Sequence, residues 1–138
     1  MPQLTPGDGQ DLLAAWKRAY EARDVDAIVD LFDDDAEYRQ APFTEPLKGV
    51  NAIRELWNGL AANQGNVEFD AENVWVSGAT VLASWHGAFT RRDTGERMRA
   101  YGFLTAELND AGKVWRMRQW PVERSVGTDS TFRVEGVA

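Results

Sequence analysis

Two spacings of hydrophobic residues divide the chain into a helical part and an extended part. Up to about residue 60, apolar side chains recur every three or four positions, which is typical of one face of a helix. Beyond residue 66, apolar and polar residues alternate, which is typical of strands. The spacing predicts three helices with one short strand among them, and then four long strands. An α+β fold class is therefore expected.

The first helix is predicted to begin at Thr5. Thr5 is a preferred capping residue, Pro6 suits the first helical position, and Asp8 lies where a capping box places its carboxylate. The face expected to pack on the core is formed by Leu12, Leu13, Trp16, Ala19 and Tyr20.

A second, short helix is predicted from Asp24, which can cap it. This helix is expected to end at the acidic run of residues 33–35. The run lacks the alternating ligands and the distant Glu of a calcium loop, so we expect a solvated turn. The buried side of the helix is predicted to consist of Ile28, Val29, Leu31 and Phe32.

Residues 36–40 are predicted to form the short strand, with Tyr38 and Gln40 on the same face. Pro42 and Pro46 prevent its continuation as an interior strand. The third helix is predicted over residues 50–60. This stretch is expected to make the mouth and one wall of a cup.

The four long strands are predicted over residues 66–76, 80–91, 98–108 and 114–123. Turn signals separate them, among them Ser77-Gly78 and Asp93-Thr94-Gly95. Short turns between successive long strands predict an antiparallel meander. Such a sheet twists and can curl around helices on one face.

Length and charge limit the possible classes of protein. The 138 residues fit a single domain, with a core over about residues 10–123 and a tail over 124–138. The net charge of −7 argues against nucleic acid or an anionic membrane as a partner, because both require clustered positive charge. No signal peptide or spanning segment is visible, so a cytoplasmic protein is expected.

Metal and thiol chemistry have little support in the sequence. The chain contains no cysteine, which excludes disulfides and Cys-ligated metal. His86 is the only histidine, and no ligand-spaced carboxylates accompany it. We therefore expect no metal and no cofactor, and we place His86 at the surface or an interface, with a role as catalytic base as the alternative.

The order of elements resembles the nuclear-transport-factor-2-like superfamily, which includes ketosteroid isomerases, limonene epoxide hydrolase and SnoaL-like polyketide cyclases. The resemblance rests on residues 23–27 before Leu31-Phe32, on Pro46 and Gly49, and on residues 52–57 and 112–118. It implies a curved antiparallel sheet wrapped around N-terminal helices, the cone-shaped, cystatin-like α+β barrel. It implies no particular activity, because one scaffold carries many functions.

The catalytic positions of ketosteroid isomerases carry other residues in this chain. The resemblance puts Gln40 in place of the proton-shuttling Asp, Trp16 in place of the oxyanion-hole Tyr, and Leu104 in place of the protonated Asp. An amide is not a base and leucine donates no proton, so that isomerase mechanism is not expected. The epoxide hydrolase pattern puts Val122 near its closing-strand carboxylate, and Glu123 would serve only if Pro121 introduced a bulge.

Strand alternation, anchored by the resemblance, predicts which side chains line the cavity. On the strand containing Trp85 and His86, Trp85 with Phe89 is the larger apolar set, so His86 is expected to point outward. The cavity should be aromatic with a few polar groups, which suits a small apolar ligand. The predicted ligand-binding residues are Trp16, Tyr20, Tyr38, Gln40, Phe43, Trp57, Trp85, Leu104, Met117 and Gln119.

Three functions remain open. The first is a small-molecule-binding SnoaL-like domain without an identifiable catalytic set. The second is an isomerase, cyclase or hydrolase acting on a small apolar substrate, and the third is a dimerisation or accessory module with a vestigial cavity. A homodimer through the convex sheet face is expected, because that face combines aromatic residues and arginines. The residues of this predicted interface are Tyr101, Phe103, Arg116, Arg118 and Trp120.

Overall fold

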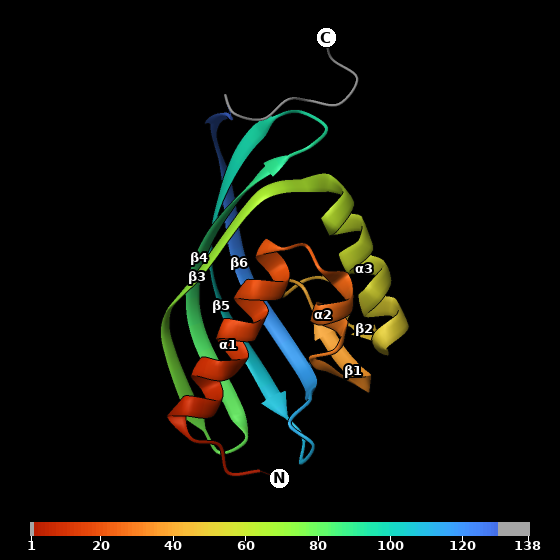
Figure 1. Cartoon of the computed structure of the whole chain (residues 1–138), viewed down its shortest axis with the longest axis vertical. Helices are drawn as coiled ribbons and strands as arrows, with labels where there is room; N and C mark the ends of the chain where they lie inside the picture. The colour runs from red at the N-terminus through yellow and green to blue at the C-terminus, as the bar shows by residue number, and fades with distance from the viewer. Residues whose placement is uncertain (1, 130–138) are drawn as a thin grey trace.

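In the computed structural model, which describes residues 2–129, three helices pack with one curved sheet (Figure 1). The α+β class predicted from the spacing is confirmed. α1 lies over the sheet, and α3 lies on the side of β1 and β2 (Figure 1). The helices are α1 (Pro6–Glu21), α2 (Val25–Val29) and α3 (Val50–Asn63), and the strands are β1 (Phe32–Arg39), β2 (Leu47–Lys48), β3 (Gln64–Ser77), β4 (Thr80–Arg91), β5 (Glu96–Leu108) and β6 (Val114–Thr128).

The sheet has the strand order β2-β1-β6-β5-β4-β3. β3 to β6 form the predicted antiparallel meander. The sheet is not antiparallel throughout, however, because β1 runs parallel to β6. The parallel pairing of β1 with β6 is possible because the chain passes through α3, and not through a hairpin, between β2 and the meander. The edge strands β2 and β3 are not paired with each other, so the sheet is an open cone and not a closed barrel.

The predicted helix starts are confirmed by their caps. The Thr5 backbone N–H donates to Asp8 Oδ2 at 2.8 Å, and the Asp8 N–H donates to Thr5 Oγ1 at 3.2 Å. Asp24 accepts a hydrogen bond from the Ala27 N–H at 3.1 Å. Both helices therefore begin where the sequence places their capping residues.

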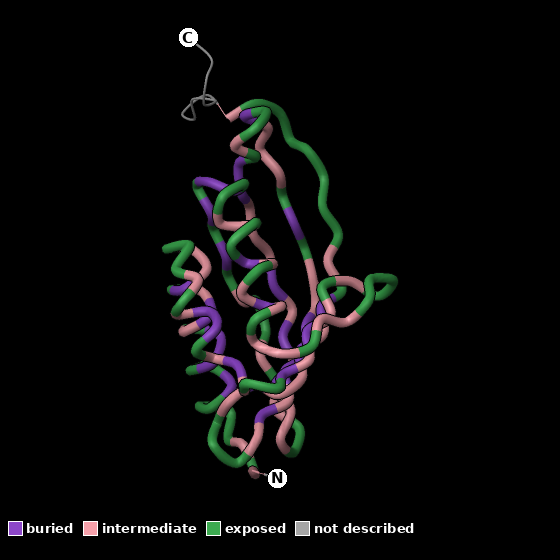
Figure 2. The backbone as a smooth tube through the Cα atoms, turned by 90° about the vertical axis from the view of Figure 1, so that its right-hand side faces the viewer, coloured by how far each residue is buried: buried purple, intermediate pink, exposed green. Residues whose placement is uncertain are grey.

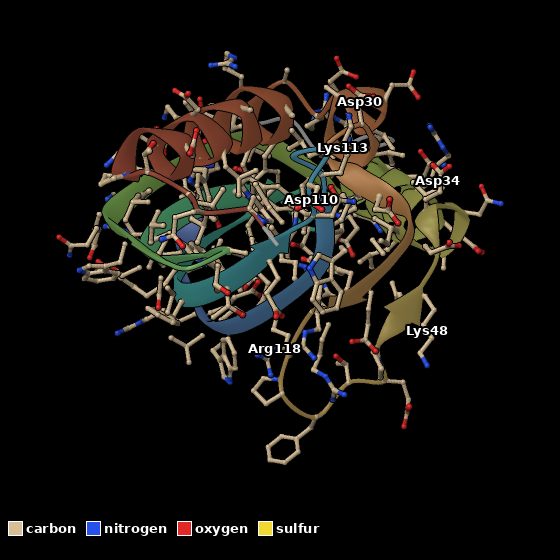
Figure 3. The ribbon with its side chains drawn as sticks, turned by 90° about the horizontal axis from the view of Figure 1, so that it is seen from below. Asp30, Asp34, Lys48, Asp110, Lys113 and Arg118 are labelled. Carbon is tan, nitrogen blue, oxygen red and sulfur yellow. The ribbon has the colours of Figure 1, made fainter. Side chains whose placement is uncertain are left out.

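The predicted end of the second helix was wrong. α2 ends at Val29, and β1 already begins at Phe32, so residues 33–35 belong to the strand. The pairing of β1 with β6 shifts between Phe32 and Glu37, which is a bulge. Asp34 and Asp35 are exposed there, and the Asp35 N–H donates to Asp33 Oδ2 at 3.1 Å. Figure 3 shows Asp34 at the margin of the molecule.

β6 extends further than the predicted 114–123. Ser125 pairs with Met98 and Thr128 pairs with Glu96, because β5 begins early enough to give the end of β6 a partner. Residues 124–128 are therefore part of the sheet and not of a tail. Asp129 is the last described residue, and residues 130–138 of the predicted tail lie outside the described residues.

The core lies between the helices and the concave sheet face, where most buried backbone runs (Figure 2). β1 pairs with β6 only as far as Arg39 and Arg118. Beyond this point β6 has a neighbour on one side only, so Pro121, which has no N–H, interrupts no ladder. The space left by β1 at this end of the cone is where the candidate site lies. No described helix is long and apolar enough to cross a membrane.

Candidate functional site

A pocket of about 220 Å³ opens between α1, α3 and the concave face of the sheet. It has an aromatic lining with amide and hydroxyl groups at several points. Trp57 packs edge-on against Trp16 and Tyr20, with ring centroids 5.3 and 5.2 Å apart. The lining residues are Trp16, Tyr20, Tyr38, Gln40, Trp57, Leu60, Gln64, Phe69, Trp85, Phe89, Gln119, Pro121 and Glu123.

Most of the predicted cavity residues meet in this pocket. Trp85 and Phe89 both line it, as their shared parity predicted, and His86 is on the other face, against the ring of Tyr101. Gln40 differs from the prediction in one respect, because its side chain is exposed at the mouth and not buried. The predicted residues that the structure brings together are Trp16, Tyr20, Tyr38, Gln40, Trp57, Trp85 and Gln119.

Three predicted cavity residues lie elsewhere. Phe43 is fully exposed, because a turn closed by the Thr44 N–H donating to Ala41 O at 3.2 Å carries it into solvent. Leu104 and Met117 do point inward, but they are buried in the core and do not line the pocket. Met117 lies where β1 and β6 are paired, and Leu104 lies directly beside that region, opposite Gln119, so side chains fill the cone at both positions.

Sequence reasoning missed several lining residues, although strand alternation contained the signal for two of them. Pro121 and Glu123 follow Gln119 at intervals of two, and the pairing of β5 with β6 is continuous from Met98 to Glu107. No bulge exists at Pro121, and Glu123 faces the pocket without one. The missed residues are Leu60, Gln64, Phe69, Pro121 and Glu123.

Two buried amides form the polar part of the pocket. Gln64 lies at the start of β3, and its Oε1 accepts a hydrogen bond from the Tyr20 hydroxyl at 3.0 Å. Gln119 lies on β6, and its Oε1 accepts one from Trp85 Nε1 at 3.2 Å. Because a buried amide without partners is costly, these bonds show how the fold supports polar groups at this depth.

Gly102 makes room for one of these hydrogen bonds. It lies on β5 directly opposite Trp85 on β4, and an added Cβ would overlap the Trp85 indole. The indole can therefore lie flat across β5 toward Gln119 only because position 102 carries no side chain. No hydrophobic pattern in the sequence indicated this contact.

The two pocket tyrosines remain protonated at neutral pH. Burial, together with the nearby charge of Glu123, raises the pKa of Tyr20 to about 12, against a smaller lowering by the bond to Gln64. Burial raises the pKa of Tyr38 as well, and Gln119 acts on it in the opposite direction. Both hydroxyls are hydrogen-bonding groups and not bases. The only carboxylate in the lining is Glu123, which is exposed at the mouth.

The site contains no metal-binding arrangement in the described part of the chain, where no group of three or more His, Cys, Asp or Glu residues converges. Two of the positions that hold catalytic residues in ketosteroid isomerases carry packing residues here. Leu104 is fully buried in apolar surroundings, and Trp16 packs between Phe32 and Trp57.

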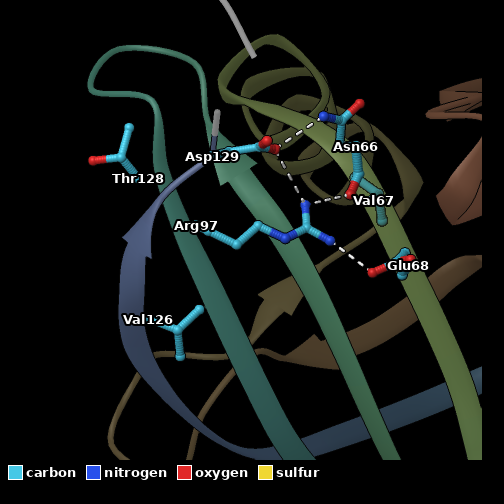
Figure 4. Close-up of a pocket in the computed structure, with 7 residues that line it drawn as sticks. All are labelled: Asn66, Val67, Glu68, Arg97, Val126, Thr128 and Asp129. Atoms are coloured by element: carbon cyan, nitrogen blue, oxygen red, sulfur yellow. Dashed lines mark hydrogen bonds and ion pairs between the residues drawn. The ribbon is translucent and has the colours of Figure 1, made fainter. Parts of the chain in front are cut away.

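A second hollow, of about 640 Å³, lies where the first residues of β3 and β5 meet the last residues of β6 (Figure 4). Its polar groups bond to one another. Arg97 donates to Asn66 O at 2.7 Å and to Glu68 Oε2 at 2.6 Å, while Asp129 Oδ2 accepts from Asn66 Nδ2 at 3.0 Å. This cluster fastens the end of β6 to β3, and we do not consider it the functional site.

The curved open sheet with helices on its concave side defines a cone-shaped α+β protein of the nuclear-transport-factor-2-like superfamily. The chain belongs to the SnoaL-like domain family, whose sequence profile matches residues 13–117. None of the curated proteins matches the chain significantly.

Solved structures with the same fold include two enzymes. An LEH-like epoxide hydrolase of Mycobacterium tuberculosis has a TM-score of 0.71 and 18% identity, with 84% of each chain covered. The epoxide hydrolase/cyclase-like enzyme SalBIII, which takes part in pyran ring formation in the polyether salinomycin, has a TM-score of 0.77 and 21% identity. That match covers 89% of this chain and 97% of SalBIII. At these identities the likeness establishes the fold alone.

Proposed function

We propose that this SnoaL-like domain binds a small, uncharged, mostly apolar molecule in the pocket between α1, α3 and the sheet. The observation that carries the proposal is the pair of buried amides, Gln64 and Gln119, in an otherwise aromatic lining. Polar groups convergent on an apolar pocket are the usual means of orienting a ligand. In a merely filled core, apolar residues of similar volume would be at least as stable.

Pocket size and charge narrow the ligand class. The volume of about 220 Å³ is below the range of roughly 300–1,000 Å³ typical of drug-sized ligands, which favours a single ring or a short branched chain. The deep part of the pocket has only neutral polar groups, and an unpaired buried charge is costly. A neutral ligand therefore fits better than an ion.

Ligand binding can be tested by tryptophan fluorescence, because Trp16, Trp57 and Trp85 line the pocket. Titration with a one-ring aromatic ketone, acetophenone, should give saturable quenching. Gln119→Leu should weaken binding by about fivefold, since a buried hydrogen bond is worth about 1 kcal/mol. Gln10→Leu, on the exposed side of α1, is the matched control and should bind normally. Quenching that never saturates would favour an accessory module with a vestigial cavity.

Glu123 supports an enzyme as the second candidate. Its charge acts on Tyr20, so a carboxylate and a phenol lie near each other at the pocket mouth. A carboxylate at that place can serve as a general base toward a bound apolar substrate, as in an isomerase, cyclase or hydrolase. Epoxides are the first substrate class to test, because the two structurally similar enzymes described above are an epoxide hydrolase and an epoxide hydrolase/cyclase-like enzyme. Glu123→Gln should abolish turnover and leave quenching by the substrate intact; unchanged turnover would exclude this role.

The outer face of the sheet supports a homodimer. Phe103 packs between Trp75 and Trp120, with ring centroids 6.3 and 6.2 Å apart, and half of the Trp75 surface is exposed. Arg118 lies on this face, away from the helices (Figure 3). Its Nε and the hydroxyl of its paired residue Thr105 are buried without a partner among the described residues. A second copy covering this face would bury the aromatic side chains and could supply acceptors.

Sedimentation velocity at micromolar concentration tests the homodimer. The wild-type chain should sediment as a dimer, and Trp120→Glu should convert it to a monomer, because a charge would be buried at the centre of the interface. Asp110→Asn changes charge in the β5–β6 turn and serves as the comparison. A wild-type monomer would refute the proposal.

A further inference from the structure

We infer that the outer face of the sheet contains an anion site, a hollow in which Arg118 binds the carboxylate of a small organic acid. The hollow has a volume of about 270 Å³ and lies on the opposite face of the sheet from the aromatic pocket, although Gln119 borders both. The inference therefore goes beyond the proposed binding function and does not depend on it. The lining residues are Glu37, Arg39, Pro42, Arg116, Arg118, Gln119 and Trp120.

Arg118 is the arginine of this hollow that has no acceptor of its own. Its guanidinium forms no hydrogen bond or ion pair with any residue of the described range 2–129, and its Nε is buried. Arg39, in contrast, donates to two backbone carbonyl oxygens of the β1–β2 loop, at 3.2 and 3.0 Å. Arg116 donates to both carboxylate oxygens of Glu107. A donor left without an acceptor is costly, so Arg118 is the group that a ligand would satisfy.

Trp120 leaves the N–H edge of the Arg118 guanidinium available. The guanidinium carbon lies over the Trp120 ring, 5.8 Å from its centroid. Such a contact uses the face of the aromatic ring, whereas the hydrogen bonds of a guanidinium are made along its own edge. The two terminal nitrogens of Arg118 are not buried and have no partner in the described chain. A planar acceptor with two oxygens, such as a carboxylate, can bind both of them from the hollow.

The neighbours of Arg118 in the sheet favour an anion. Arg39 pairs directly with Arg118 across β1 and β6, so two cations share one row of the outer face. Like charges directly opposite each other are destabilising, and an anion bound beside them offsets the repulsion. On the other side, Thr105 of β5 pairs with Arg118, and its buried hydroxyl has no partner among the described residues. The row therefore combines two cations with a hydroxyl, which suits an oxyanion.

The rest of the lining favours a monocarboxylate with an apolar body. Glu37 also lines the hollow, and its charge repels a dianion such as phosphate more strongly than a monoanion. The net charge of −7 on the whole chain acts in the same direction. Pro42 and the Trp120 ring provide apolar surface for a hydrocarbon group. Benzoate has these properties and serves as the probe.

Calorimetric titration of the full chain with benzoate tests the inference. Binding should be saturable, and Arg118→Gln should weaken it by about tenfold or more, because hydrogen bonds between charged groups are the strong ones. Arg118→Lys keeps the charge but lacks the planar fork, so it should bind benzoate less tightly than the wild type and more tightly than Arg118→Gln. Arg124→Gln is the matched control. It removes the same charge from the same strand and face, outside the hollow, and should bind normally.

Nuclear magnetic resonance locates the bound carboxylate in the wild-type chain. The Nε–H resonance of Arg118, assigned by its absence in Arg118→Lys, should move as benzoate is added, with the half-saturation found by calorimetry. Benzamide, the neutral molecule of nearly the same shape, should leave it in place. Benzoate bound only in the aromatic pocket would not produce this pattern. If Arg118→Gln does not fold, Arg118→Lys and this resonance decide the question.

The outcomes separate this inference from the proposed function. A moved Arg118 resonance with weaker binding in the Arg118 variants supports the anion site, whether or not acetophenone binds in the pocket. Equal benzoate binding by the wild type and Arg118→Gln overturns it, and so does an equal weakening in Arg124→Gln. Absence of saturable benzoate binding at millimolar concentration overturns it as well. If Arg118→Gln then sediments as a monomer while the wild type is a dimer, the acceptor for Arg118 belongs to a second copy of the chain.

Discussion

The two ends of the cone are built from the same strands but are filled differently. At the closed end, where β1 pairs with β6, the inward residues Val81, Ala106 and Val114 are completely buried, and so are Ala83 and Leu104 at its border with the pocket. At the open end, beyond the last β1–β6 pair, the inward residues of β6 are Gln119, Pro121 and Glu123, and a pocket replaces the packed core. The loss of one neighbouring strand thus separates a packed end from an end that contains a pocket.

The difference shows where this fold tolerates polarity. The two buried amides at the open end each have a bonded partner, Tyr20 for Gln64 and Trp85 for Gln119. At the closed end the inward side chains are small or branched and apolar. They fill the space and need no side-chain hydrogen bonds. Substitutions should therefore cost stability at the closed end and binding at the open end.

The largest expected effect is that of a cavity at the closed end. Leu104→Ala should lower the free energy of unfolding by about 2–5 kcal/mol, because a fully buried leucine leaves a void that its neighbours cannot fill. Leu60→Ala, at the pocket wall, should cost less than half as much, because the space there is already open. Urea denaturation of both variants checks this. Equal losses would contradict the division into two ends.

An intermediate effect is expected for Gly102→Ala. Overpacking against the Trp85 indole should cost about 1–3 kcal/mol of unfolding free energy. In Trp85→Phe the overlapping atoms are absent, so Gly102→Ala should cost much less in that background. A double-mutant cycle by urea denaturation measures the difference. Additive losses would mean that the indole does not depend on the glycine.

Sequence reasoning succeeded where a single rule determined the outcome. Strand alternation placed Tyr38, Trp85 and Gln119 inward, and capping chemistry placed Thr5 and Asp24 at helix starts. It failed where the chain leaves β1 and strand alternation no longer applies. Gln40 follows the last residue of β1 and is exposed, and Phe43 lies in a turn whose direction depends on its own hydrogen bonds.

The remaining parts of the site could not be read from a pattern. Gln64 ends a helix and begins a strand, so neither periodicity applies to it, and its burial depends on Tyr20 and on Arg23, which donates to its carbonyl oxygen at 2.7 Å. The open position at Gly102 depends on the size of the residue opposite on β4. Such contacts follow from the register and not from hydrophobicity.

At high pH the open end should weaken first. The pKa of Tyr20 is raised to about 12 in the folded protein, above its ordinary value of 10.0, so the unfolded chain loses its proton first as pH rises. Its contribution to stability is fully present below pH 10 and is lost between pH 10 and about 12. Urea denaturation over this range should show a steeper loss in the wild type than in Tyr20→Phe. Parallel curves would contradict the burial of this hydroxyl.

The smallest effect is expected at the mouth itself. Phe43 is fully exposed, so Phe43→Ser should change the free energy of unfolding by no more than about 0.5 kcal/mol. The affinity for acetophenone should also be unchanged, because the Phe43 ring is not part of the pocket lining. The turn itself is retained, since the hydrogen bonds between Thr44 Oγ1 and the Ala41 backbone do not involve the Phe43 side chain. A loss of affinity without a loss of stability would show that this loop folds over the bound ligand, and the open end would then be closed in the complex.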